Sequence, residues 1–395
     1  MLDTLERLPA DSILGLSAAC RADPNPDKVD LTVGIYMDEQ GNCPVFEAVR
    51  EAQRALVAEE TTKAYMPPEG DDAFNLGMQR LVLGGDSGAL RDGRVSSIQT
   101  PGGCGALRIG AEIIHSAVPA ARVWVSDPTW PVHLPLLGSV GLRFENYRYY
   151  EAGSHGVNFE GMVADLGAAT RGDVVLLHGC CHNPCGADLS LDQWDVIADM
   201  AERQGFTPFV DIAYQGLGDG LAEDAAGLRL LADRLPEVIL AASCSKNMGL
   251  YRERTGTAMF VCRDRDNAGA ILSQALVAAR RIYSMPPAHG ALLAGRILSD
   301  GRLDALWRSE LGTMCGRING LRTALREKLE GASGLDFGFI EREKGMFSFL
   351  GLTPEQTARL REEHSVYMLG SSRINVAGVN ARNIDYLAEA VAKVL

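Results

Sequence analysis

Long apolar runs are missing from this sequence. No stretch of about 18 consecutive apolar residues occurs, so no membrane-spanning helix and no membrane partner are expected. Positive charge is also scarce, since 51 acidic residues outnumber 38 lysines and arginines for a net charge of −13. Nucleic-acid binding needs clustered lysines and arginines, so this composition argues against such a partner. The first residues, Met1–Arg7, lack the basic and then apolar pattern of a signal peptide, and we expect a cytoplasmic location.

Zinc-type cysteine spacing is absent as well. The chain has nine cysteines, an odd number without a signal peptide, which favours free thiols over a disulfide framework. The dense cluster from His178 to Cys185 lacks the second cysteine pair, well downstream, that zinc sites usually have. We interpret these cysteines as small buried apolar side chains, and no metal is predicted.

Length and strand patterning indicate the fold. A chain of 395 residues exceeds what one compact core usually holds, so two domains are expected. Between residues 95 and 262, helical segments alternate with apolar, strand-like runs at Arg122–Ser126, Asp173–His178, Pro208–Ile212, Glu237–Ala242 and Thr257–Cys262. This alternation predicts an α/β fold with a mostly parallel sheet covered by helices on both faces.

The remaining elements are less regular. A helix is predicted over 44–60, and a capping box at Ser190–Gln193 predicts another that runs to Gln204. A helix from Ala106 is expected after the glycine-rich segment that precedes it, and a long helix is expected over 302–330. Short strands near 345–350 and 366–376 and a last helix from Asn383 predict a second, smaller α/β unit.

Polar residues gather where the predicted strands end, and parallel sheets bind ligands beyond those ends. Lys246 and Arg254 follow the apolar run that ends near Ala242. Taken alone, this lysine is more often a solvent-facing residue, because lysine is rarely buried. The segment Gly102–Gly105 opens a helix directly after a strand, which suits an anion, although an ordinary glycine turn has the same sequence. Its spacing does not match a dinucleotide fingerprint, so a lone phosphate fits better.

Two more strand ends add an acid, a phenol and an amide. Asp211 ends an apolar strand and needs a cationic or hydrogen-bonded partner, and Tyr214 lies three residues further on. Asn183 is placed at the end of another strand. A phosphate cradle, a lysine for a Schiff base, an acid for a pyridinium nitrogen and donors for a phenolate together fit pyridoxal phosphate.

The chain resembles the aspartate and aromatic amino acid aminotransferases, which are class I, fold-type-I pyridoxal-phosphate enzymes. The resemblance runs nearly end to end and is carried by long motifs: Trp124–Trp130, His178–Gly186, Asp211–Gly216, Ser243–Asn247 and Arg373–Gly378. It implies an N-terminal arm (1–14), a large cofactor-binding domain (44–312) and a small domain built from 15–43 and 313–395.

The resemblance also implies residue roles. Lys246 would be the Schiff-base lysine and proton shuttle, and Asp211 would hold the pyridinium proton, with Tyr214 and Asn183 on the phenolate. Trp130 would stack on the ring. The phosphate would be held by Gly103, Cys104, Ser243 and Arg254, joined by Tyr65 of a neighbouring subunit. Substrate contacts would come from Gly34, Phe347, Arg373 on the α-carboxylate and, again from the neighbour, Arg280.

Departures from the family pattern affect the expected specificity. Cys104 stands where the family has threonine or serine, and Cys185 replaces the threonine of Asn-Pro-Thr-Gly. Val132, Met285 and Ala64 stand where asparagine is frequent. Because several of these changes make the site less polar, we expect aromatic donors to be accepted beside dicarboxylates.

The implied reaction is a two-stage, ping-pong transamination from aromatic amino acids, aspartate or both to 2-oxoglutarate. The small-molecule partners would be amino acids and 2-oxo acids, and the shared site implies a homodimer. A strict aspartate aminotransferase, a pyridoxal-phosphate lyase or decarboxylase, and a non-catalytic cofactor-binding module are the alternatives. Paired arginines that would retain two carboxylates argue against decarboxylation.

Overall fold

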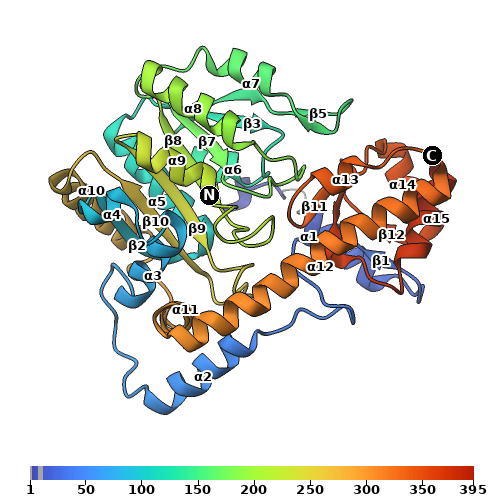
Figure 1. The fold of residues 1–395 in the computed structure, drawn as a ribbon, viewed down its shortest axis with the longest axis horizontal. Helices are drawn as coiled ribbons and strands as arrows, with labels where there is room; N and C mark the ends of the chain where they lie inside the picture. Colours follow the sequence, from blue (N-terminus) through green and yellow to red (C-terminus); the bar gives the residue numbers. More distant parts are fainter. Residues whose placement is uncertain (1, 8–11) are drawn as a thin grey trace.

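A computed structural model describes residues 2–7 and 12–395 of the chain. Its centre is a seven-stranded sheet with the strand order β2-β10-β9-β8-β7-β3-β4 (Figure 1). The strands of this sheet are β2 (Val95–Pro101), β3 (Arg122–Asp127), β4 (Arg143–Arg148), β7 (Val174–His178), β8 (Thr207–Ile212), β9 (Val238–Ser243) and β10 (Thr255–Val261). The predicted mostly parallel α/β sheet is therefore confirmed, with β10 alone antiparallel to both of its neighbours.

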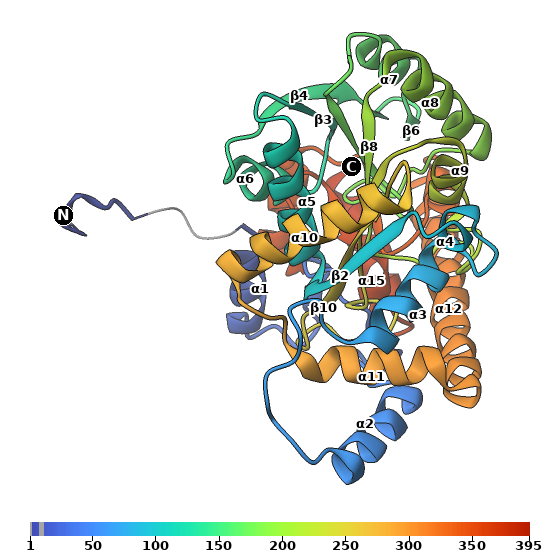
Figure 2. The same ribbon diagram turned by 90° about the vertical axis from the view of Figure 1, so that its left-hand side faces the viewer.

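Helices cover both faces of this sheet because its strands are apolar on both faces. In β7, Val174 and Leu176 join one core cluster, whereas Val175 and Leu177 join the other. Helices α5 (Gly102–Ala117) and α10 (Arg265–Ile282) supply the first cluster. The second cluster is covered by α3 (Asp72–Leu83), α7 (Phe159–Leu166), α8 (Leu191–Gln204), α9 (Ala226–Arg234) and α11 (Ala288–Ser299). Figure 2 shows α5 and α10 on one side of the sheet and α8 and α9 on the other.

A third core cluster lies in a separate unit around α15 (Ile384–Val394). Here β1 (Val29–Asp30) pairs in parallel with β12 (Val366–Tyr367), so the N-terminal and C-terminal regions lie side by side. The long helix α12 (Gly301–Ser333) runs from the large unit to this one (Figure 1). The unit also contains α13 (Phe339–Arg342), β11 (Phe347–Phe349), α14 (Pro354–His364), β13 (Arg373–Asn375) and the 3-10 helix η2 (Val376–Gly378).

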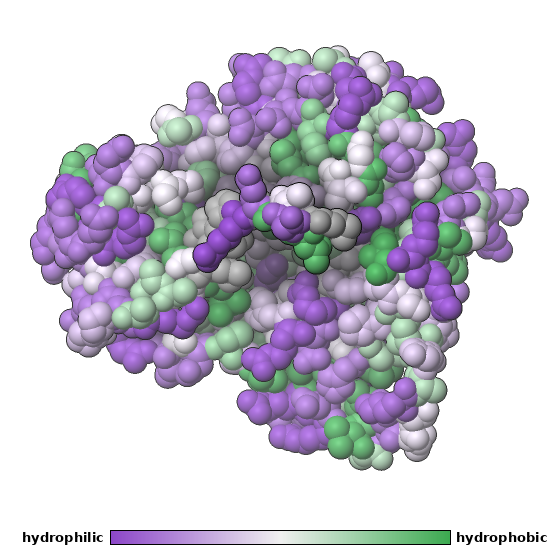
Figure 3. Space-filling view, turned by 180° about the vertical axis from the view of Figure 1, so that it is seen from behind, coloured by the Kyte–Doolittle hydropathy of each residue, from purple (hydrophilic) through white to green (hydrophobic). Residues whose placement is uncertain are grey.

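The remaining elements are short or peripheral. They are η1 (Leu2–Thr4), α1 (Ser12–Ala22), α2 (Glu47–Glu59), α4 (Gly88–Arg91), α6 (His133–Gly138), β5 (Tyr150–Glu151) and β6 (Gly156–Val157). Apolar patches border a central hollow on the face seen in Figure 3. Within the described part of the chain, no helix combines the length and apolar character that crossing a membrane requires.

Several sequence-based boundaries were wrong. Helix α5 begins at Gly102 rather than at Ala106, so the glycine segment forms its first turn. Helix α2 begins at Glu47, three residues after the predicted start. Asn183 is not at a strand end, because β7 stops at His178 and the chain then turns through Cys181, whose φ is +51°. The partition into an arm and two domains stays a prediction; residues 8–11 of the arm lie outside the described residues, and the separate core around α15 supports the partition.

Candidate active site

The reversed direction of β10 brings two cations to one edge of the sheet. Lys246 follows the end of β9, and Arg254 precedes the start of β10. Since Gly256 pairs with Ser243 in antiparallel register, the segment between the strands leaves and re-enters the sheet at the same edge. The carboxyl end of β8, which carries Asp211, pairs with β9 at that edge.

These strand ends enclose a cavity of about 290 Å³. Twelve of the fourteen residues predicted for the site line this cavity: Gly34, Gly103, Cys104, Trp130, Asn183, Asp211, Tyr214, Ser243, Lys246, Arg254, Phe347 and Arg373. The other two, Tyr65 and Arg280, lie outside it. Tyr65 is 93% exposed, and Arg280 is exposed on α10. Their predicted role in a neighbouring subunit stays a prediction.

One end of the cavity is an anion cradle at the start of α5. The first backbone N–H groups of a helix have no acceptor within the helix and point out of its N-terminus. Gly102 has a φ of +68°, and a Cβ there would lie 2.6 Å from Nη2 of Arg254. A Cβ on Gly103 would lie 3.6 Å from the side chain of Ser243. The guanidinium, the hydroxyl and the helix terminus therefore converge on one position, and only glycine fits at Gly102.

Asp211 is a buried carboxylate held by a histidine. Its Oδ2 lies 3.0 Å from Nε2 of His133, whose Nδ1 lies 2.8 Å from Oγ1 of Thr129. Burial alone raises the pKa of Asp211, but the hydrogen bond and charge of His133, together with His178 and Lys246, leave that pKa below its ordinary value. The carboxylate is thus kept ionised and can face a positively charged group.

Lys246 lies over the ring of Tyr214, with Nζ 4.6 Å from the ring centroid. Burial lowers the pKa of Lys246, and the nearby Asp211 only partly opposes this. Burial also raises the pKa of Tyr214 above its ordinary value, so its hydroxyl stays protonated and can donate. The buried Oδ1 of Asn183 has no partner, which suits a site completed by a ligand.

Another wall of the cavity comes from the unit around α15. Arg373, on β13, is only 3% exposed; its Nη2 donates to the carbonyl of Thr32 at 2.6 Å, and its Nε has no partner. The guanidinium lies 4.4 Å from the ring centroid of Phe347. A Cβ on Gly34 would lie 2.6 Å from that ring, so Gly34 and Phe347 close the wall tightly. A buried arginine with a free donor is suited to a carboxylate ligand.

Sequence reasoning missed several residues of the site, among them His133, His178 and Tyr251. His133 and His178 belong to the network behind Asp211, and Tyr251 lines the cavity while its hydroxyl accepts from the backbone N–H of Tyr36 at 2.9 Å. His178 could have been predicted as a site residue, because it stands at the end of β7, where it pairs in register with Asp211. Nothing in the sequence marks His133 as a site residue, since it begins a short helix far from Asp211 in the sequence.

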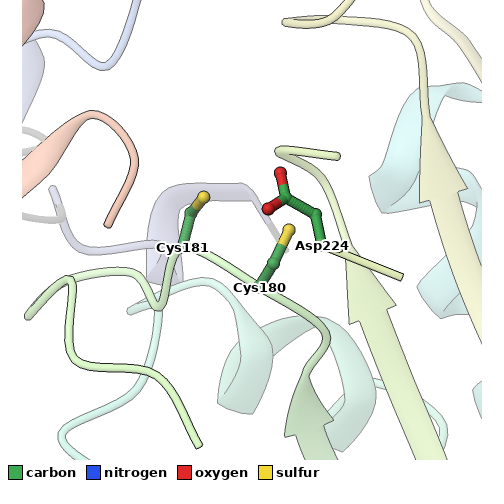
Figure 4. Close-up of side chains that lie close together, drawn as sticks. All are labelled: Cys180, Cys181 and Asp224. Carbon is green, nitrogen blue, oxygen red and sulfur yellow. The ribbon is translucent and has the colours of Figure 1, made fainter. Parts of the chain in front are cut away.

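The cysteine cluster lies beside the cavity. Cys180 and Cys181 lie close to Asp224, and their thiols and its carboxylate point toward one another, with ligand atoms within 4.8 Å (Figure 4). The carboxylate of Asp224 already accepts from the backbone N–H groups of Gly216, Gly218 and Asp219. All nine cysteines are free thiols, and Cys185 lies 3.2 Å from Nδ1 of His182.

Comparison with known proteins places this geometry in context. The family model described as aminotransferase class I and II matches residues 26–391. The aromatic-amino-acid aminotransferase of Paracoccus denitrificans is 48% identical over 100% of both chains. The aspartate aminotransferase of Escherichia coli (strain K12) is 44% identical, again over 100% of both. A solved aromatic-amino-acid aminotransferase from Burkholderia pseudomallei, covalently bound to pyridoxal phosphate, matches with a TM-score of 0.98 at 42% identity, covering 100% of this chain and 99% of that one.

Proposed function

This chain belongs to the class I and II aminotransferase family and is a pyridoxal-phosphate-dependent transaminase; we propose that it accepts both aromatic amino acids and aspartate as donors, with 2-oxoglutarate as acceptor. The observation that carries the proposal is the single cavity in which Lys246, Asp211, Arg254 and Arg373 meet. Relatives named for each donor class are 48% and 44% identical to it over the full length.

The residues present fit the cofactor. At Gly102 the N-terminus of α5 lies beside the guanidinium of Arg254, and this pair of positive groups suits an anion. The ionised Asp211 suits a protonated ring nitrogen. When bound, pyridoxal phosphate supplies an electron sink that stabilises negative charge developing at the substrate α-carbon.

Each of the surrounding side chains can then be assigned a role in holding the cofactor. We assign the phosphate to the α5 N-terminus with Ser243 and Arg254, and the ring face to Trp130. Asp211 holds the proton on the ring nitrogen, because an ionised carboxylate stabilises that charge in a buried site. The hydroxyl of Tyr214 stays protonated and donates to the ring oxygen, beside the amide of Asn183.

Lys246 is the proton carrier in this assignment. Burial lowers the pKa of Lys246, so Nζ gives up its own proton more readily than an exposed lysine and can then accept the proton from the substrate α-carbon and later return it. Arg373 binds the α-carboxylate and so fixes the α-carbon within reach of Nζ. Phe347 and Gly34 close one wall of the cavity and help to exclude water.

Arg373→Lys is expected to raise the KM for amino and oxo acids about 10- to 150-fold, which corresponds to the loss of one charge-assisted hydrogen bond worth about 1.5–3 kcal/mol. A lysine keeps the charge but cannot bind a carboxylate through two parallel hydrogen bonds. Steady-state kinetics measures this effect. The exposed Arg382, which reaches the carbonyl of Glu39, provides the matched control Arg382→Lys with an unchanged KM. An unchanged KM in Arg373→Lys would remove Arg373 from substrate binding.

Two residues that were expected to widen the donor range lie away from this cavity. Val132 and Met285, which departed from the family pattern, do not line the cavity. Met285 instead lines a second cavity of about 770 Å³ together with Tyr65 and Tyr283. A donor screen with aspartate, glutamate, phenylalanine, tyrosine and tryptophan tests the range directly. Turnover of both classes is expected, and turnover of aspartate with none of phenylalanine or tyrosine would contradict it.

We also propose a homodimer, because two exposed residues have predicted roles in a shared site. Tyr65 and Arg280 are exposed in one chain, and we propose that each completes the site of a second chain. Sedimentation of the active enzyme is expected to show a dimer, and a fully active monomer would refute the shared site. The cytoplasmic location stays a prediction.

A further inference from the structure

A thiol lies within the anion cradle. Cys104 is the third residue of α5, is only partly buried and lines the cavity. The other cysteine that lines the cavity, Cys180, is 6% exposed. Its contact with Cys181 lowers the pKa of Cys180, but burial outweighs this and raises the pKa to about 12. Cys104 is therefore the more accessible thiol of the two.

The surroundings of Cys104 favour an anionic reagent. Burial raises the pKa of its thiol, while the positive charges of Arg254 and Lys246 oppose that rise and Asp211 adds to it. The same two cations and the α5 N-terminus attract anions. The cavity is also built for an anionic ligand, because the buried Arg373 in its wall has a donor, Nε, without a partner.

Cys104 directly follows the two glycines at the start of α5 and lines the same cavity as Ser243 and Arg254. A Cβ at Gly102 would lie 2.6 Å from Nη2 of Arg254, so the surroundings of this position are closely packed. A group attached to the Cys104 thiol would enter the position that we assign to the phosphate. Cofactor binding and modification of this thiol therefore exclude each other.

We propose that Cys104 is a modification site for small anionic thiol-reactive disulfides and thiosulfonates, which react with it in the cofactor-free enzyme and prevent cofactor loading. The inference rests on the proposed phosphate position at α5. Conversely, bound cofactor covers the thiol of Cys104 and protects it from modification.

The reaction is a thiol exchange that needs no other oxidant. The Cys104 thiolate attacks the divalent sulfur of a thiosulfonate, so a new S–S bond forms and the bond to the sulfonyl sulfur breaks. The sulfinate leaves with the electron pair, and the thiol proton passes to solvent. An added thiol such as dithiothreitol reverses the modification by the same exchange.

The test uses 2-sulfonatoethyl methanethiosulfonate on cofactor-free and cofactor-loaded enzyme, with peptide mass spectrometry to locate the adduct. Cys104 is expected to be modified in the cofactor-free enzyme and protected in the loaded enzyme, with inorganic phosphate slowing the reaction. The modified enzyme is expected to lose cofactor binding, measured by fluorescence titration, and to regain it after dithiothreitol. The cationic 2-aminoethyl analogue is expected to react more slowly, because Arg254 and Lys246 repel it.

Two variants test whether modification of Cys104, and not of another thiol, causes the loss of cofactor binding. Cys104→Ser is expected to bind the cofactor equally well before and after treatment. Cys43→Ser, which removes an exposed thiol outside the cavity, is expected to lose binding as the parent enzyme does. Equal modification of Cys104 in both forms, or loss of binding in treated Cys104→Ser, would overturn the inference. If untreated enzyme bound no cofactor, the proposed function itself would fail.

Discussion

Lys246→Ala is expected to lower kcat by about 10²- to 10⁴-fold, the range that a positioned general base contributes. The physical reason is that Lys246 lines the cavity and that burial lowers its pKa, which eases the loss of its own proton before Nζ takes one from the substrate. Cofactor binding is expected to persist, because Arg254, Ser243 and the α5 N-terminus remain. Single-turnover kinetics with a donor amino acid measures the loss.

Lys344, which belongs to the smaller unit of the same chain, provides the control for Lys246→Ala. Lys344 donates to Asp219 at 2.6 Å and lies outside the cavity, so Lys344→Ala removes an amine without touching the site. Its kcat is expected to stay close to that of the parent enzyme. Near-normal turnover in Lys246→Ala would exclude Lys246 as the proton carrier.

Asp211→Asn is expected to lower kcat by about 10²- to 10³-fold, as removal of a preorganised electrostatic group does. Asparagine preserves the shape of the side chain but cannot supply the negative charge that the ring nitrogen needs to keep its proton. Steady-state kinetics at saturating substrate measures the change. Asp173→Asn is the matched control, since Asp173 pairs with Arg122 just before β7 begins, at the opposite edge of the same sheet. Similar losses in both variants would show a general effect of removing a buried acid.

His133 gives the Asp211 assignment a pH-dependent signature. The hydrogen bond from His133 helps to lower the pKa of Asp211, against burial, which raises it. In His133→Asn, the pKa of Asp211 is expected to rise, so the carboxylate takes up a proton at a higher pH than in the parent enzyme. The acidic limb of the kcat profile is therefore expected to move to higher pH. An unmoved limb would mean that His133 does not act through Asp211.

The strands and the strand-end residues could be predicted because their signals are local. Buried strands read as continuous apolar runs when both faces are covered, and the polar residue that follows each run stands out. Lys246 and Asp211 were therefore recognisable from their neighbours in sequence. The first turn of α5 was misplaced because glycines weaken the helix signal even where a helix terminus needs them.

What could not be predicted depends on contacts between distant segments. His133 reaches Asp211 only because α6 packs beside the end of β8, and nothing in its own sequence context marks it. Val132 and Met285 were expected to make the site less polar, yet neither lines the cavity of one chain. The predicted tasks of Tyr65 and Arg280 depend on a second copy of the chain.

The most direct test of transamination by this site is the visible absorption of the cofactor-loaded enzyme during two separate half-reactions. Addition of a donor amino acid alone is expected to bleach the visible band of the lysine-bound cofactor, and 2-oxoglutarate added afterwards is expected to restore it. In Lys246→Ala, both the bleaching and the recovery are expected to be slower than in the parent enzyme. A band that no donor bleaches, or that bleaches and does not return with any 2-oxo acid, would contradict the account.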